Sequence, residues 1–157
     1  MEIKMPTEEV SLPSQGKLYP KDSPLSSGKV EVRYMTAKEE DILSNQNYIE
    51  KGNVLDKLLQ SVLVDKINVD DMLIGDKNAV MVAVRALGYG KDYTFRYGGE
   101  DQTVDLSLLG TKELDPDFEN ATENEFTFTL PKSENVVTFK LLTGQDEKKI
   151  DQELKGL

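Results

Sequence analysis

The alternation of polar and apolar positions predicts a β-strand near the start of the chain. Between Lys29 and Met35, apolar or aromatic side chains at positions 30, 32 and 34 alternate with charged side chains at 29, 31 and 33. A period of two residues is typical of a strand that buries one face and exposes the other. We therefore expect a half-buried strand at 29–35.

A helical period follows this strand. Thr36 and Glu39 have the spacing of a capping box, in which the hydroxyl and the carboxylate bind free N–H groups of the first helical turn. This helix is expected to continue to about Tyr48. A second helix is expected after Asn53, which can cap it. The apolar face of the second helix is broad and contains Val54, Leu55, Leu58, Leu59, Val62 and Leu63.

A third helix is expected at 77–87, after a short turn or helix at 69–74 and a restart at Gly75-Asp76. Its residues are apolar nearly all round, so it should lie in the middle of the fold. Arg85 is the exception. Because a lone guanidinium on a buried helix needs a carboxylate or carbonyl partner, we interpret Arg85 as a structural anchor. A role in partner binding stays open.

From Gly88 onward the pattern predicts strands. Residues 93–97 and 103–106 alternate around a tight turn at Gly98-Gly99-Glu100-Asp101, and residues 125–130 and 136–142 flank a turn at 131–135. The acidic segment 110–124 is expected to be a loop, and 145–154 a short polar helix. The chain as a whole predicts an α+β fold: an N-terminal extended arm and strand, a central helical cluster with one buried helix, two C-terminal β-hairpins and a short terminal helix.

The first 28 residues differ in composition from the rest. Prolines at positions 6, 13, 20 and 24, with glycines and serines, predict an extended arm (1–28) followed by a single α+β domain (29–157). The large apolar side chains of the arm can dock onto a partner or pack as a strap on the chain's own core, and the pattern leaves both open. On the docking hypothesis, the partner-binding residues are Leu12, Pro13, Gly16, Leu18, Tyr19 and Pro20.

Composition excludes several classes of function. The 157 residues contain no cysteine and no histidine, which rules out disulfides and thiolate metal sites and removes the commonest general base. The acidic residues at 65, 70, 71 and 76 lack the spacing of an EF-hand loop. A net charge of −10 repels nucleic acid and anionic membranes. We expect no catalytic residue, no cofactor and no metal, and neither a secretory signal nor a membrane span is visible, which indicates a cytoplasmic protein.

Three stretches resemble the baseplate hub and hub-assembly proteins of T-even-like contractile-tailed bacteriophages. The first is Leu-Pro-Ser-Gln-Gly-Lys-Leu-Tyr-Pro at 12–20, and the second is Met-Thr-Ala-Lys-Glu-Glu-Asp-Ile-Leu at 35–43. The third runs from Leu-Ile-Gly-Asp at 73–76 through Arg85 to Tyr93, and it is similar to a central helix that Gly-Asp opens and Tyr-Gly closes. On this resemblance, the structural anchors are Asp76, Arg85, Tyr89 and Gly90.

The resemblance implies a structural or assembly protein of the tail baseplate hub that catalyses no reaction. Its partners would be other phage baseplate or tail proteins, or another copy of itself, in the host cytoplasm during assembly or in the virion tail. Many relatives carry Cys-x-x-Cys in the first hairpin, whereas this chain has Arg-Tyr-Gly-Gly at 96–99. The residues leave open whether the protein stays in the virion or acts only as a chaperone.

Two other functions are considered. A small acidic regulator or inhibitor, including a nucleic-acid mimic, would need carboxylates clustered on one face. A hydrolase based on Asp and Lys would need a cleft that holds a buried lysine or a carboxyl group with a raised pKa.

Overall fold

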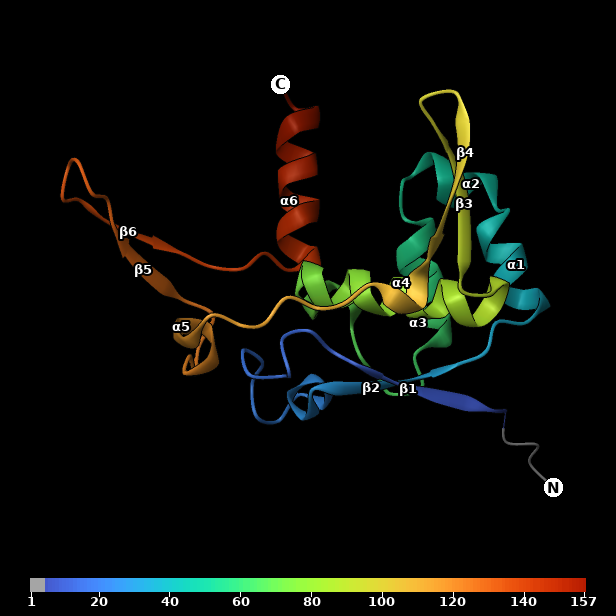
Figure 1. Ribbon diagram of the computed structural model, residues 1–157, viewed down its shortest axis with the longest axis horizontal. Coiled ribbons are helices and arrows are strands. Elements are labelled where there is room, and N and C mark those ends of the chain that lie inside the picture. Colours follow the sequence, from blue (N-terminus) through green and yellow to red (C-terminus); the bar gives the residue numbers. More distant parts are fainter. Residues whose placement is uncertain (1–4) are drawn as a thin grey trace.

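The computed structural model describes residues 5–157, which form an α+β fold (Figure 1). Over these residues there are three separate two-stranded antiparallel sheets and six α-helices. This confirms the fold class expected from the sequence. In chain order the elements are β1 (Thr7–Ser11), β2 (Lys29–Arg33), α1 (Ala37–Leu43), α2 (Gln46–Glu50), α3 (Val54–Val62), α4 (Ile74–Tyr89), β3 (Asp92–Tyr97), β4 (Glu100–Asp105), α5 (Pro116–Glu119), β5 (Phe126–Thr129), β6 (Val136–Phe139) and α6 (Gly144–Lys155).

One apolar core holds the N-terminal half together, and we call this half the body (residues 5–84). The sheet β1–β2 lies along one side of α3 and α4 (Figure 1), with Val30 and Val32 facing inward as the alternation predicts. Among the described residues, the buried apolar side chains are Leu12, Tyr19, Leu25, Val30, Val32, Leu58, Leu59, Val62, Leu63, Ile67, Val69, Met72, Leu73, Val80 and Val84.

The expected division into an arm and a domain at residue 28 is corrected by the structure. Residues 7–11 form β1 and pair with β2, and Leu12 and Tyr19 are only 3% and 8% exposed. Pro13 lies in a turn, and Pro24 opens a short 3₁₀ helix, Pro24–Ser27. The N-terminal segment is therefore a strap on the chain's own core, which is one of the two alternatives that its composition left open.

Helix α4 buries one side and leaves the other half-covered. Val80 and Val84 point into the core and are almost fully buried. The apolar residues on its outer side, such as Met81 and Val82, are half-buried. The helix begins at Ile74, three residues before the predicted start. Because its outer side is apolar but incompletely covered, α4 forms the floor of a groove.

The helix expected from Thr36 to about Tyr48 is two helices. The capping box at its start is confirmed, since the Glu39 carboxylate accepts the Thr36 N–H at 2.8 Å. The helix stops at Leu43, and the Asn45 side chain caps α2 by accepting the N–H of Tyr48 at 3.3 Å. An Asn at an N-cap position favours a new helix start over continuation.

The C-terminal half forms three projections from the body (Figure 1). Hairpin β3–β4 turns at Gly98-Gly99, whose φ angles of 64° and 88° give the left-handed backbone that a two-residue hairpin turn requires. Hairpin β5–β6 and helix α6 are also present as predicted, and the predicted loop contains the short helix α5. No described helix is long and apolar enough to cross a membrane.

Candidate functional site

A buried carboxylate fastens the strap to the rest of the body. Asp76, which is 1% exposed, accepts hydrogen bonds from the Ser14 N–H at 2.9 Å, the Ser14 hydroxyl at 2.5 Å and the Tyr19 hydroxyl at 2.7 Å. The Tyr19 oxygen in turn accepts the Leu73 N–H at 2.8 Å. Burial, together with the hydrogen bond to Asp76, raises the pKa of Tyr19 above its ordinary value. The first and third of the stretches that resemble baseplate proteins thus meet at Asp76.

The residues assigned to partner binding on the docking hypothesis lie mostly inside the body. Leu12, Gly16 and Tyr19 are buried, Pro13 and Leu18 are half-buried, and Pro20 is exposed. The side chains of Leu12 and Tyr19 are therefore parts of this core, and they are not available to a partner on the surface.

Gly16 has a structural role in the strap. Its φ angle is +76°, and a Cβ atom there would lie 2.5 Å from both Gly28 N and Ser26 O. Two turns of the strap can approach this closely only because the residue has no side chain.

A second buried carboxylate, Glu39, forms an ion pair with Arg33 between β2 and α1, where the sequence indicated only a helix cap. The Glu39 side chain is 0% exposed and accepts hydrogen bonds from Arg33 at 2.5 Å and from the Ser61 hydroxyl at 2.6 Å. Burial opposes ionisation of Glu39, but these bonds and those from Thr36 outweigh it and hold its pKa well below the ordinary value. This pair ties the strand, α1 and α3 together.

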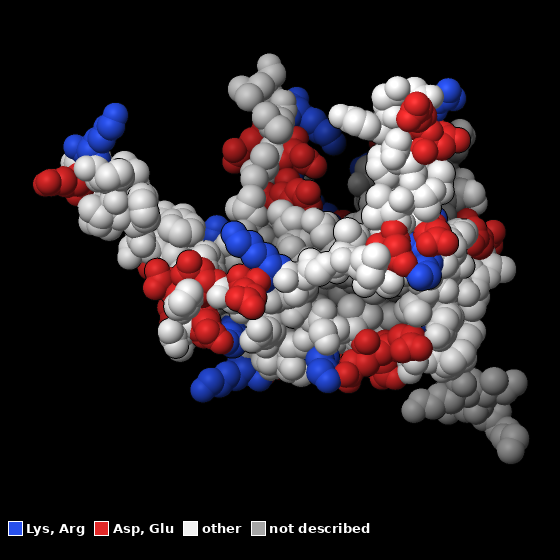
Figure 2. Space-filling view, in the orientation of Figure 1, with Lys and Arg blue, Asp and Glu red and all other residues white. Residues whose placement is uncertain are grey.

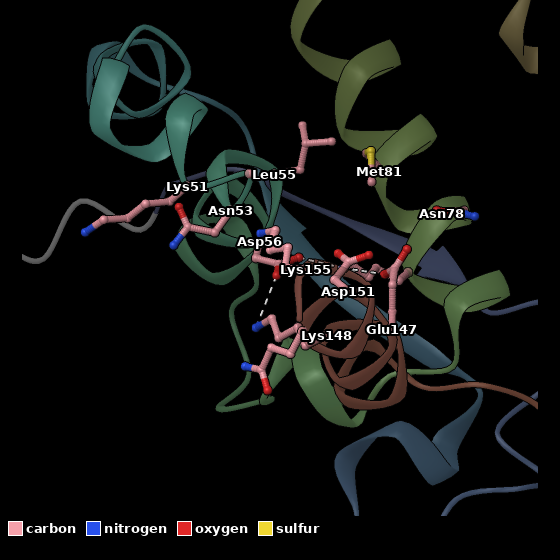
Figure 3. A pocket seen from close by; sticks show the side chains of 13 residues that line it. Lys51, Asn53, Leu55, Asp56, Asn78, Met81, Glu147, Lys148, Asp151 and Lys155 are labelled. Carbon is pink, nitrogen blue, oxygen red and sulfur yellow. Dashed lines mark ion pairs between the residues drawn. The ribbon is translucent and has the colours of Figure 1, made fainter. Parts of the chain in front are cut away.

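Helix α6 stands on the body over a polar cleft of about 620 Å³. Lys77 of α4 lies 2.6 Å from Asp56 of α3, and Lys148 reaches from α6 to the other oxygen of Asp56 at 3.3 Å (Figure 3). Lys148 also pairs with Asp70, and Lys77 lies 3.7 Å from Glu147. The network of alternating charges clamps the first turns of α6 onto α3 and α4.

The same cleft contains the buried lysine that a hydrolase based on Asp and Lys would need, since Lys77 is 8% exposed. Its closest carboxylate does not suit acid–base catalysis, however. Burial of Asp56 opposes ionisation, but Lys77 and Lys148 outweigh it and lower the pKa of the carboxyl. A carboxylate held ionised between two lysines is a stable anion in an ion-pair network, and it is a poor proton donor or acceptor at neutral pH.

An apolar groove of about 480 Å³ runs along the outer side of α4. At its end, the Arg85 guanidinium lies over the rings of Tyr89 and Tyr93, at 4.9 and 5.5 Å from their centroids, and donates to the Gly90 carbonyl at 3.4 Å. The Tyr89 hydroxyl donates to Glu40 at 2.6 Å. Arg85, Tyr89 and Gly90 thus meet at the C-terminal end of α4. Arg85 was expected to be buried, but it is only half-buried, and its hydrogen bond to the Gly90 carbonyl is open to solvent.

Both hairpins expose large apolar side chains. On β3, Tyr93, Phe95 and Tyr97 are exposed, and on β5–β6 Phe128 is 55% exposed and Phe139 44%. An isolated two-stranded hairpin is marginally stable in water, and apolar surface of this kind on a folded protein marks an interaction site. The sequence predicted both hairpins, but alternation alone could not predict that their apolar side chains are exposed.

An acidic hollow of about 830 Å³ adjoins β5, lined by residues of the loop before it and of the hairpin. Figure 2 shows acidic side chains gathered at the base of this hairpin. The rings of Phe118 and Phe126 pack at 4.4 Å between centroids with a tilt of 41°, and both line the hollow. The hollow therefore combines an aromatic wall with an acidic rim.

Within residues 5–157, no group of three or more acidic side chains is placed to hold a metal ion. Comparison of the chain with known proteins finds no matching family model, no similar curated protein and no similar solved structure. The function is therefore argued from the residues and their arrangement.

Proposed function

We propose that this chain is a structural or assembly protein of a contractile phage tail baseplate hub, and that it acts by binding other baseplate proteins without catalysing a reaction. The class of protein is proposed from the three stretches that resemble hub proteins. Two of them are joined in the structure by the hydrogen bonds of Ser14 and Tyr19 to Asp76, so they form one structural unit.

The observation that supports a binding role is the distribution of burial along the chain. In the described residues, every buried apolar side chain of the core lies between Leu12 and Val84. The two hairpins and α6 come after Val84, carry exposed aromatic and aliphatic side chains, and have no core of their own. Apolar surface is stabilised when another surface covers it, and the projections offer much of it.

The acidic charge supports the proposal less than the exposed apolar surface does. A nucleic-acid mimic would need carboxylates clustered on one face, whereas the acidic group that Figure 2 shows lies at the base of one hairpin. Aromatic side chains, among them Phe118, Phe126 and Phe128, line the same hollow as these carboxylates. The aromatic side chains exposed on the projections support a protein–protein interface, because such interfaces are enriched in aromatic residues.

Cross-linking during infection tests this function. The tagged chain is expressed in a host infected with a T-even-like phage, and amine cross-links are identified by mass spectrometry. We expect cross-links to tail baseplate proteins from lysines of the projections, such as Lys91, Lys132 and Lys149, with far fewer from body lysines such as Lys66. Cross-links only to host enzymes or nucleic-acid-binding proteins would contradict the proposal and favour an acidic inhibitor.

A further inference from the structure

We propose that the outer edge of β5 binds an extended, basic segment of a partner protein, which adds a third strand to the hairpin β5–β6. This inference rests on the proposed function, because it names the surface and the chemistry through which one partner is held. The occupant is a segment with alternating apolar side chains and with Lys or Arg at its ends.

The hairpin has one apolar face and one polar face. Phe126 pairs with Phe139 and Phe128 with Val137, so these four side chains share a face. The opposite face carries mainly threonines, at positions 127, 129 and 138. Phe128 is 55% exposed, and Phe126 is half-buried, packing against Phe118 and Phe139. A third strand with large apolar side chains at alternate positions would extend this face and shield it from water.

The hydrogen-bond pattern shows which backbone groups of β5 are free for a new strand. Leu130 donates its N–H to the Asn135 carbonyl across the hairpin at 2.9 Å. Inward and outward backbone groups alternate along an antiparallel strand, so Phe126 and Phe128 also bond inward, and the N–H and C=O groups of Thr127 and Thr129 point outward. In the described structure β5 pairs only with β6, which leaves this outer edge open.

Charge selects the chemistry of the occupant. Residues 112–125 carry one basic side chain, Lys112, and six acidic ones: Glu113, Asp115, Asp117, Glu119, Glu123 and Glu125. Within the described chain no ion pair involves Asp117, Glu123 or Glu125, and all three line the hollow beside β5. These carboxylates would attract the basic ends of a partner segment and repel an acidic one.

The same charges argue against a second copy of the chain at this edge. A symmetric dimer places each surface patch against itself, so the two acidic loops would face each other. A partner with basic residues beside its strand has no such repulsion.

Synthetic peptides test the proposal on the full chain by fluorescence anisotropy. The probe has alternating valines and threonines between lysine pairs. One matched peptide has glutamates in place of the lysines, and another keeps the lysines but interrupts the valines with prolines. We expect the lysine-flanked probe to bind at least tenfold more tightly than either matched peptide.

Two proline variants identify the edge. Thr127→Pro removes an outward N–H from β5 without removing a hydrogen bond of the hairpin, and Thr138→Pro does the same on the outer edge of β6. We expect Thr127→Pro to weaken binding of the probe at least tenfold, and Thr138→Pro to leave it within twofold of wild type. Both variants should melt within about 2 °C of wild type, since the core lies in the body.

A triple variant, Asp117→Asn with Glu123→Gln and Glu125→Gln, tests the charge. It should weaken binding of the probe about tenfold and flatten the dependence of this binding on salt.

Any one of four results would overturn the proposal. These are equal binding of the lysine and glutamate peptides, loss of binding in Thr138→Pro in place of Thr127→Pro, a dimer formed through this hairpin, and no binding of the probe. If Thr127→Pro still cross-links to baseplate proteins during infection, this surface is wrong while the proposed function stands. If the wild-type chain gives no such cross-links, the proposed function itself fails.

Discussion

Replacing Asp76 by alanine should loosen the strap from the body. The carboxylate accepts three hydrogen bonds, two from Ser14 and one from Tyr19, and all three donors are buried. Alanine leaves these donors without an acceptor in a place that water does not reach. The strap contributes Leu12, Tyr19 and Leu25 to the core, so its attachment matters for the whole body.

The size of the effect follows from the number of donors left unpaired. Each buried donor without a partner costs roughly 1–3 kcal/mol, and relaxation of the strap will recover part of this. We expect Asp76→Ala to lower the free energy of unfolding by about 3–5 kcal/mol, against a total of roughly 5–15 kcal/mol for a domain of this kind. For a chain of this length, that corresponds to a fall of about 10 °C in the melting temperature.

Thermal unfolding followed by circular dichroism measures the stability lost in Asp76→Ala. Tyr19→Phe and the double variant complete a double-mutant cycle. Tyr19→Phe removes one donor to Asp76 and the acceptor of the Leu73 N–H, so it should cost about 1–3 kcal/mol. The double variant should cost less than the sum of the single ones, because the two side chains share a hydrogen bond. A melting temperature within 2 °C of wild type for Asp76→Ala would refute the reasoning, and so would strictly additive costs.

Three further predictions concern the body. Glu39→Gln should be less stable than wild type at neutral pH, and it should lose less stability than wild type on acidification. Because folding lowers the pKa of Glu39, the stability that its carboxylate contributes is present above the unfolded-state pKa of about 4.3 and is lost as the pH falls below it. Equal slopes of unfolding free energy against pH for the variant and wild type between pH 5 and 3 would contradict this. Gly16→Ala should destabilise the body by several kcal/mol, because its Cβ would lie 2.5 Å from backbone atoms, whereas Gly110→Ala, with no atom near its Cβ position, should change stability by less than about 1 kcal/mol; urea titration compares the two. Deleting residues 1–20 should unfold the body, and a truncated protein with unchanged near-ultraviolet circular dichroism would show that the strap is dispensable.

Local patterns predicted the elements well. The hairpins, the capping box at Thr36 and the apolar face of α3 all depend on residues close together in sequence, and each is present. Their details differ from the prediction, since β4 begins three residues earlier than expected and Leu55 of the α3 face is 43% exposed. The break between α1 and α2 also had a local signal, the N-cap residue Asn45, which the longer helical period obscured. Strand β1 had almost none, because Thr-Glu-Glu-Val-Ser contains one apolar residue and becomes a strand by pairing with β2.

The candidate sites depend on contacts that sequence patterns do not encode. Whether Leu12 and Tyr19 dock on a partner or on their own core is decided by Asp76, which lies 62 positions after Ser14 in the chain. The pairing of Lys77 with Asp56 likewise joins two helices, and a lysine at the start of the predicted apolar helix gave no sign of burial. Exposure of the hairpins also depends on distant contacts. Alternation predicts that a strand has an apolar and a polar face, but it does not predict whether another part of the chain covers the apolar face.

The separation of core from projections has a consequence for how a partner would be bound. Because the buried apolar side chains end at Val84, the hairpins and α6 can shift or become more ordered without disrupting the core. The first turn of α6 is held by the ion pairs of Lys148 and Lys77 and by the Gly144 N–H, which donates to Met72 O at 3.0 Å. Ion pairs open to water are weakened by salt and by competing charges, whereas the body is held by apolar contacts that salt does not weaken. A basic partner segment near α6 would therefore act on a part of the molecule whose attachment is largely electrostatic, and the body would serve as the fixed support on which α6 is held.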